Sequence, residues 1–250
     1  MHDLLGYFKR SFIQRDKNGV SAGVCKPAAS FKTLFPYAYS GLEKFVNKNP
    51  KRERKFVVTN LLKDHESYWN VNRHRVLHWT KDFVKQHNLE DKSFIGEVGK
   101  GGRMGFDDLY LKHLANSKIV ITVSTYELSL LFLVHLDVHK LHSSLPFQCN
   151  PNEWEGDYRL WEALLSSALV FVDHMVILDM LPHPFVHREH LIFYNSSNQT
   201  EFNELLSYYA EHEKEAQEIA MAGYQHTLQW HMPANRVDYV LDTIKNKLPS

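Results

Sequence analysis

The sequence predicts an α/β fold of the Rossmann-like type, a doubly wound parallel sheet preceded by an irregular N-terminal lead-in. Apolar segments of strand length alternate with segments of helical periodicity, which is the pattern of βαβ units. The strand segments are continuously rather than alternately apolar, as expected for strands covered on both faces. A hydrophobic content of 44% over 250 residues is enough to build a substantial core.

The alternation begins after residue 54. The β-branched run KFVVTNL predicts a buried strand, and the apolar side chains that follow it recur at helical spacing. Further along, a short strand opens into the glycine-rich loop of SFIGEVGKGGRMG, and a helix and another strand follow this loop. The expected elements are a strand at 55–61, a helix at 72–88, a strand from 93, a helix at 106–118 and a strand at 118–122.

The second half continues the same alternation. We expect a helix at 157–166, strands at 168–173 and 190–196, a long helix at 201–231 and a last helix at 233–248. Gly223 marks a point where the long helix would break. We therefore assign the Rossmann-like domain to residues 55–250, and residues 1–54 to a lead-in that is a linker from, or a remnant of, another domain.

Composition excludes several classes of partner and site. Lys+Arg and Asp+Glu are both 29, so no overall field draws the chain to nucleic acid or to an anionic membrane. The two cysteines, in unrelated contexts, favour neither a disulfide framework nor a cysteine metal site. No apolar run approaches the roughly 20 residues that span a bilayer, and the N-terminus lacks the features of a signal peptide. We expect a soluble chain with no nucleic-acid partner.

The stretch EGDYRLWEALLSSALVFVD, residues 155–173, is the first candidate site. In a doubly wound sheet, ligands bind beyond the carboxyl ends of the strands, where helix N-termini offer N–H groups and partial positive charge. Gly156 or Asp157 can cap a helix here, and Arg159 and Glu162 share one face near its start. A Glu there can accept ribose hydroxyls, and an Arg suits a diphosphate. The alternative is an ordinary ion pair on a solvated helix face.

The glycine-rich loop GEVGKGGRMG is the second candidate site. Its glycines let the backbone approach a ligand, and Lys100 and Arg103 can neutralise a diphosphate leaving group. The loop matches neither a Walker A motif nor a dinucleotide fingerprint, so a solvated loop without a ligand is the alternative.

Residues 156–173 and 222–241, GDYRLWEALLSSALVFVD and AGYQHTLQWHMPANRVDYVL, resemble the C-terminal, donor-binding domain of GT-B glycosyltransferases of the glycosyl-transferase-1, spore-maturation-like type. In that group an R-x-x-E-A helix and a small-residue turn precede a strand that ends in Asp, and a terminal R-V helix follows. The similarity covers about residues 55–245, with gaps, and is strongest over 149–175.

The resemblance implies transfer of a hexosyl or pentosyl residue from a UDP- or GDP-sugar, without a required metal ion. It places Glu162 on the ribose and the helix start, Gly156, Asp157 and Tyr158, near the phosphates. The sequence departs from the family at Ser167, where relatives often have Gly. If that turn needs positive φ, serine costs about 1 kcal/mol or more. The paired Glu motif of many relatives is also shifted, because neither Glu153 nor Glu155 has the usual spacing to Glu162.

GT-B enzymes use two Rossmann-like domains, and only 54 residues precede the one we identify. We therefore expect either a partner chain that supplies the N-terminal domain or a noncatalytic remnant or subunit that binds nucleotide sugar without turnover. A different doubly wound enzyme, such as a phosphatase or epimerase, is a third possibility. The acceptor, whether glycan, protein or lipid, stays open. So does the compartment, cytoplasmic, or the Golgi lumen if an N-terminal anchor has been lost.

Residues 123–148 interrupt the resemblance. Val-Ser at one end and Phe-Gln at the other can be encoded by GTAAGT and TTTCAG, the usual ends of an intron. We hypothesise that the segment translates a retained intron; the rival is a genuine helical insertion. Three histidines within it, His135, His139 and His142, have spacing compatible with zinc, but no supporting shell of residues is readable, so we expect no metal site.

Overall fold

The computed structural model describes residues 7–8, 34–35, 42–62, 71–96, 108–123, 158–173 and 181–246. Five parallel strands form one sheet in the order β4-β3-β5-β6-β7, and two-residue strands β1 (Tyr7–Phe8) and β2 (Leu34–Phe35) pair separately. The sheet strands are β3 (Phe56–Asn60), β4 (Ser93–Ile95), β5 (Ser117–Thr122), β6 (Leu169–Asp173) and β7 (Ile192–Tyr194). The predicted Rossmann-like fold is confirmed.

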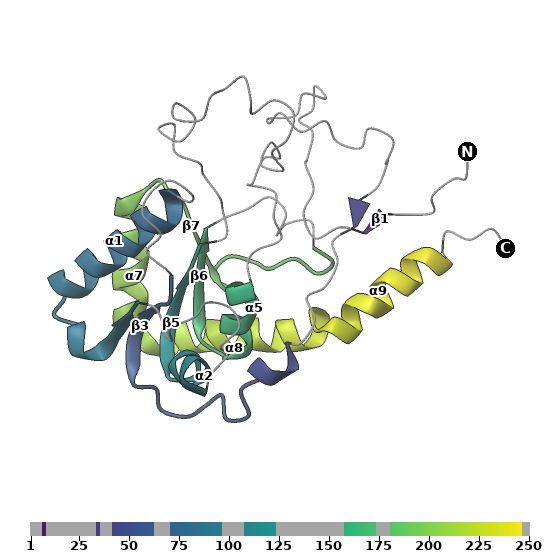
Figure 1. The fold of residues 1–250 in the computed structure, drawn as a ribbon, viewed down its shortest axis with the longest axis horizontal. Coiled ribbons are helices and arrows are strands. Elements are labelled where there is room, and N and C mark those ends of the chain that lie inside the picture. Colours follow the sequence, from purple (N-terminus) through teal and green to yellow (C-terminus); the bar gives the residue numbers. More distant parts are fainter. Residues whose placement is uncertain are drawn as a thin grey trace, which may run out of the picture.

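Helices cover both faces of this sheet (Figure 1). They are α1 (Val71–Gln86), α2 (Asp108–Ala115), α5 (Tyr158–Leu165), α7 (Gln199–Glu211), α8 (Glu213–Trp230) and α9 (Pro233–Lys245), with 3-10 turns η1 (Glu43–Phe45) and η2 (Glu90–Lys92). The side chains of α1 and α7 form one apolar core with the sheet, and those of α2 and α5 form another. Helix α8 contributes to both cores, so it ties the two faces together.

The break in the long C-terminal helical segment lies at His212, between α7 and α8, and not at Gly223 as the sequence suggested. His212 leaves the helical region with φ −100° and ψ 61°, whereas α8 runs without interruption through Gly223. A Cβ on Gly223 would lie 2.0 Å from the backbone carbonyl oxygen of His190. The glycine therefore marks a close approach of two backbones, not a helix end.

A partly buried arginine, Arg54, joins three segments at the amino ends of the strands. The guanidinium of Arg54 donates hydrogen bonds to the carbonyl oxygens of Ser117 and Ser166 and to the hydroxyl oxygen of Ser167, the last at 2.6 Å. Burial, and to a lesser degree the charge of Arg52, lowers the pKa of Arg54 to about 10. Arg54 therefore ties the lead-in to the turn between α5 and β6.

The turn between α5 and β6 has positive φ at Ser167, the position where relatives often have Gly. Ser167 has φ 57°, in the left-handed region that costs a non-glycine residue about 1 kcal/mol or more. Its buried hydroxyl accepts hydrogen bonds from Arg54 and, at 3.1 Å, from Asn47, and it donates to the carbonyl of Ser166. Serine thus provides contacts that glycine could not.

Residues 42–54 of the lead-in pack against the domain. Leu42 and Phe45 are buried in the core on the α2–α5 face, and the hydroxyl of Tyr224 on α8 donates to the carbonyl of Asn47.

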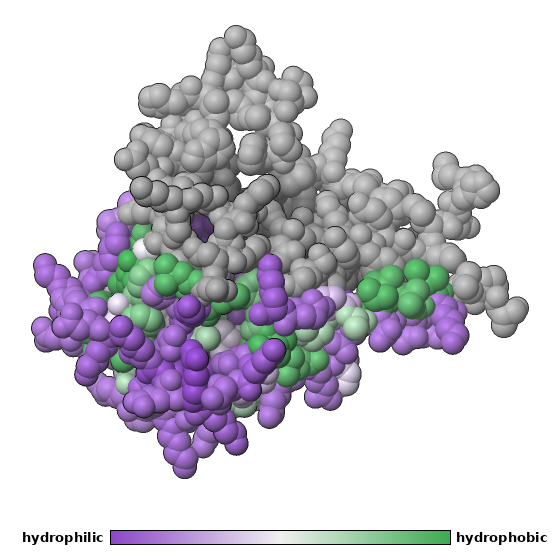
Figure 2. Space-filling model, turned by 60° about the horizontal axis from the view of Figure 1, so that its bottom comes forward, coloured by the Kyte–Doolittle hydropathy of each residue, from purple (hydrophilic) through white to green (hydrophobic). Residues whose placement is uncertain are grey.

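Figure 2 shows hydrophobic surface on α9, where the side chains of Val237 and Leu241 are 54% and 57% exposed. Of the helices in the described residues, none has the length and apolarity needed to cross a membrane.

Candidate functional site

The sheet order places a topological switch point beside β3. The chain passes from β3 to β4 on one side and then crosses to β5 on the other. Ligands of doubly wound sheets bind at the carboxyl ends of the strands that flank such a point. The side chain of Asn60, at the end of β3, donates to Thr80 at 2.9 Å and accepts from the backbone N–H of Leu62 at 3.0 Å. These bonds fix the backbone where the ligand crevice is expected.

Helix α5 follows β5 and begins at this same edge of the sheet. It carries both Arg159 and Glu162, as predicted, and its apolar side, which includes Leu160 and Leu164, is buried against the sheet. Glu162 is itself only 3% exposed. Its Oε2 accepts a hydrogen bond from the hydroxyl of Tyr110 on α2. The carboxylate is therefore held in a fixed position between two helices.

Tyr110 is a member of this cluster that the sequence analysis missed. Burial raises its pKa far above the ordinary value; the neighbouring Arg159 opposes this effect and Glu162 adds to it. The phenol therefore remains protonated and acts as a hydrogen-bond donor. In the sequence, Tyr110 is indistinguishable from an ordinary apolar position of a short helix, so only the shared core of α2 and α5 and the hydrogen bond to Glu162 reveal it.

The other predicted site residues are not all described. Tyr158 is the first residue of α5, and its place near a phosphate stays a prediction. Gly156 and Asp157 lie outside the described residues, as do Lys100 and Arg103 of the glycine-rich loop. Their proposed contacts with phosphate remain predictions.

A hollow of about 320 Å³ lies at the carboxyl ends of β6 and β7. It is lined by Asp173, Phe193, Tyr194, Asn195, Ser196 and Glu201. Asp173, which is 1% exposed, is the strand-terminal Asp of the sequence motif, whereas Glu201 comes from the first turn of α7. Two carboxylates, an amide and a hydroxyl around one hollow suit a ligand rich in hydroxyl groups.

A second hollow, of about 280 Å³, lies at the opposite edge and is lined by Arg52, Arg54, Lys118 and other residues. Because ligands of this fold bind at the carboxyl ends, the hollow beside β6 and β7 is the better candidate. Within the ranges that the structure describes, no group of three or more His, Cys, Asp or Glu could hold a metal ion. The histidines of segment 123–148 lie outside those ranges.

Comparison with protein families gives one match. A family model described as glycosyl transferase-like matches residues 100–242, a span that includes α2, β5, α5, β6, β7, α7, α8 and most of α9. No curated protein sequence matches the chain.

Several solved structures share the fold. TarM superposes with a TM-score of 0.53 at 11% identity, over 86% of this chain and 40% of its own. Anabaena HepE, in complex with UDP and glucose, gives 0.51 at 10% identity, over 87% and 58%. An alpha-glucosyltransferase in complex with UDP-glucose and DNA gives 0.52 at 9%, over 86% and 59%. The chain thus spans about two fifths to three fifths of the length of these proteins.

Proposed function

Since the chain belongs to the glycosyl transferase-like family, we propose that it binds a nucleotide-sugar donor at the carboxyl ends of β3, β5 and β6 and takes part in transferring the sugar to an acceptor. The observation that carries the proposal is the buried carboxylate of Glu162. It lies on α5, the helix that begins at this edge, and it accepts a hydrogen bond from Tyr110 of α2. A carboxylate fixed in this way is suited to accept the two hydroxyl groups of a ribose.

Charge supports the placement of the diphosphate. The first turn of α5 contributes backbone N–H groups and the positive end of the helix dipole. Arg159 lies in that turn, close enough to Tyr110 to influence its pKa. We assign the diphosphate to Arg159 and Tyr158 of α5 and to Gly156 and Asp157, which precede them in the sequence. Lys100 and Arg103 are then candidates to stabilise the negative charge that develops as the diphosphate leaves.

The hollow beside β6 and β7 is our candidate for the sugar of the donor. Asp173 and Glu201 would repel a diphosphate, but they can accept hydrogen bonds from sugar hydroxyls. The donor would be a UDP- or GDP-sugar; the complexes of HepE and of the alpha-glucosyltransferase with UDP or UDP-glucose make UDP the first nucleotide to test.

A noncatalytic donor-binding subunit is the second candidate function of this chain. The solved structures that it resembles are considerably longer than the segment that superposes. A chain that carries only the donor-binding half would bind nucleotide sugar without turnover, and a partner chain would supply the acceptor-binding half. This alternative predicts donor binding but no transfer by the isolated chain.

The test is calorimetric titration of UDP, GDP, UDP-glucose and GDP-mannose into the purified chain. We expect one of them to bind, and Glu162→Ala to weaken its binding by about 1–3 kcal/mol, because hydroxyl groups of the ribose lose their acceptor. Glu218→Ala is the matched control, since Glu218 is an exposed residue of α8. Circular dichroism of both variants separates a lost contact from a lost fold.

Binding that survives Glu162→Ala unchanged would remove Glu162 from the site. If the intact chain binds none of the four ligands but a chain without residues 123–148 does, the insertion blocks the site. Failure of both chains to bind would contradict the proposed function. A radiolabelled-sugar transfer assay with the ligand that binds then separates an enzyme from a noncatalytic subunit.

A further inference from the structure

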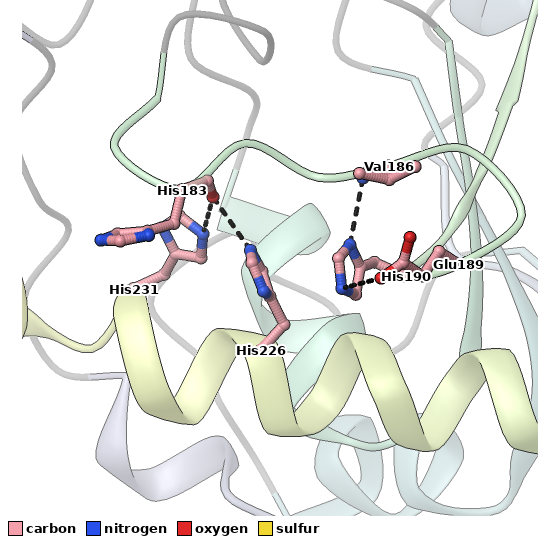
Figure 3. A network of polar contacts seen from close by, with 6 residues as sticks. All are labelled: His183, Val186, Glu189, His190, His226 and His231. Atoms are coloured by element: carbon pink, nitrogen blue, oxygen red, sulfur yellow. Dashed lines mark hydrogen bonds and ion pairs between the residues drawn. The ribbon is translucent and has the colours of Figure 1, made fainter.

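The segment 181–191, which leads into β7, lies along the C-terminal half of α8 and is fastened there by histidines (Figure 3). The carbonyl oxygen of His183 accepts hydrogen bonds from Nε2 of His226 and of His231, both at 2.9 Å. Because a carbonyl oxygen only accepts, both ring nitrogens must carry a proton. His183 itself has φ 56°, a conformation that costs energy for a non-glycine residue and that these contacts stabilise.

The other end of the segment depends on a histidine that must be neutral. Nδ1 of His190 accepts a hydrogen bond from the backbone N–H of Val186 at 3.1 Å. Only an unprotonated nitrogen has the lone pair to accept, so this ring carries its single proton on Nε2, 3.5 Å from Glu189. In the same way, Nδ1 of His187 accepts from the backbone N–H of Phe193 at 3.0 Å. Protonation would place one N–H against another and break each bond.

A second proton on His231 would be buried without a hydrogen-bond acceptor among the described residues. His231 is 2% exposed and packs against Phe185 and Trp161. Its Nε2 is used by His183, and its Nδ1 is buried without a hydrogen-bond partner among the described residues. Burial first, and then the charges of Arg236 and His226, hold the pKa of His231 well below its ordinary value.

The rings are also close enough to repel one another when charged. The centroids of His190 and His226 are 4.1 Å apart, and those of His226 and His231 are 5.1 Å apart. Burial lowers the pKa of both His190 and His226, and a neighbouring histidine adds to this effect at each. The hydrogen bond to the carbonyl of His183 opposes it at His226, and Glu189 opposes it at both. Glu189 of the segment is an acidic neighbour of His190 and His226, and Arg236 of α9 is a permanent cation near His231.

We propose that segment 181–191 is a pH-sensitive strap, docked on α8 while His190, His226 and His231 are neutral and released when these rings take up protons. The docked form excludes protons that the released form binds, because protonation would break the bond to Nδ1 of His190 and would bury a charge on His231. Docking is therefore complete above about pH 6.5, the ordinary pKa of histidine, and is lost progressively as the pH falls below that value.

Release of the strap would affect the proposed donor site through its contacts with α5. Phe185 of the strap packs against Trp161, the neighbour of Glu162 on α5, with ring centroids 5.8 Å apart. The carbonyl oxygen of His190 lies against Gly223 of α8, which is also close to Leu164 of α5. Loss of these contacts would loosen the helix that carries Glu162 and weaken donor binding in acid. This consequence rests on the proposed function; the strap itself does not.

Hydrogen exchange measured by mass spectrometry on the full chain tests the strap. Between pH 7.5 and 5.5, after correction for the intrinsic effect of pH, exchange in residues 181–191 should accelerate by about tenfold per pH unit below 6.5 for each proton taken up. Exchange in α1 reports global unfolding and should accelerate less. Equal acceleration in residues 181–191 and in α1, or none in residues 181–191, would overturn the proposal.

Two isosteric substitutions identify the responsible groups. In His190→Asn the amide oxygen can replace Nδ1 as an acceptor, and in His226→Gln the amide nitrogen can replace Nε2 as a donor; neither side chain titrates. The double variant should keep the strap protected at pH 7.5 and lose most of the acceleration in acid, whereas His87→Gln, at an exposed histidine after α1, should behave as the parent does. Undiminished acceleration in the double variant would refute the assignment.

Titration of UDP at pH 7.5 and 5.5 then examines the link to the donor site. Binding that weakens in acid in the parent chain, but not in the double variant, is the expected result. Equal binding at both pH values would sever the strap from the site. Absence of UDP binding at pH 7.5 would count against UDP as the donor and would leave the exchange result as it stands.

Discussion

Two tyrosine hydroxyls that donate to glutamates show how burial changes the value of one hydrogen bond. Tyr110 and Glu162 meet inside the protein, whereas Tyr208 donates to Glu215 at 2.7 Å on the surface. Water replaces the hydroxyl readily at the surface pair, whereas the carboxylate of Glu162, which is 3% exposed, has little access to water. The buried carboxylate therefore depends on its donor, and the exposed one does not.

This difference predicts the effects of two matched substitutions. Tyr110→Phe should lower the free energy of unfolding by about 1–3 kcal/mol and weaken nucleotide binding, because the carboxylate of Glu162 loses a donor in a buried position. Tyr208→Phe removes the same chemical group and should change neither quantity appreciably. Urea denaturation and calorimetry measure the two effects; equal losses in both variants would show that the buried pair has no special role.

Ser167 combines an unfavourable backbone conformation with favourable side-chain contacts, and two substitutions separate them. Ser167→Ala keeps the strain and loses the hydroxyl bonds, so it should destabilise the protein by about 1–3 kcal/mol. Ser167→Gly loses the same bonds but relieves the strain, and should be more stable than Ser167→Ala by about 1 kcal/mol. Urea denaturation gives both numbers. If Ser167→Gly were the less stable of the two, backbone strain at this turn would be disproved.

At the scale of elements, hydrophobic periodicity predicted the helices and strands well but could not place the break between α7 and α8. The apolar spacing continues across His212, which has no sequence signal of a helix end. Gly223, which has such a signal, lies within α8 because the helix packs on the carbonyl of His190. A glycine that permits a turn and a glycine that permits close packing are the same letter in the sequence.

The candidate site was predictable only where its residues belong to one element. Arg159 and Glu162 share α5, and their spacing was enough to pair them on one face. Tyr110 and Glu201 come from α2 and α7, and they reach the carboxyl edge only through tertiary packing. A single sequence carries no signal for such convergence.

The contact at Gly223 predicts a reversal of the usual effect of alanine in a helix. Gly→Ala inside a helix normally stabilises it by about 1 kcal/mol. Gly223→Ala should instead lower the free energy of unfolding by about 1–3 kcal/mol, because the new methyl group would collide with backbone of the strap. The exposed α8 residue Gln225, changed to Ala, is the control and should shift stability by at most about 0.5 kcal/mol. A stabilised Gly223→Ala variant would contradict the observed packing.

At the scale of the whole molecule, the sheet closes without residues 123–148. Strand β5 pairs with β6 up to Thr122, and α5 begins at Tyr158. A chain in which Thr122 is joined to Cys149 should therefore fold cooperatively, as judged by circular dichroism during denaturation. Retention of the buried Val123 should add up to about 2 kcal/mol of stability. If neither the chain that joins Thr122 to Cys149 nor the one that also retains Val123 folds, a genuine insertion is favoured. Sequencing of the transcript tests the intron hypothesis directly.

The position of Arg54 bears on how this protein can be divided for expression. The boundary suggested by hydrophobic rhythm falls immediately after it, at Lys55, so a fragment cut there would lack the guanidinium that satisfies Ser117, Ser166 and Ser167. It would also lack Leu42 and Phe45, and would expose the apolar surface that they cover. Such a fragment should accumulate in inclusion bodies, whereas one that starts ahead of Leu42 should remain in the supernatant. The smallest autonomous unit should therefore include residues 42–54, ahead of the boundary that the hydrophobic pattern suggests.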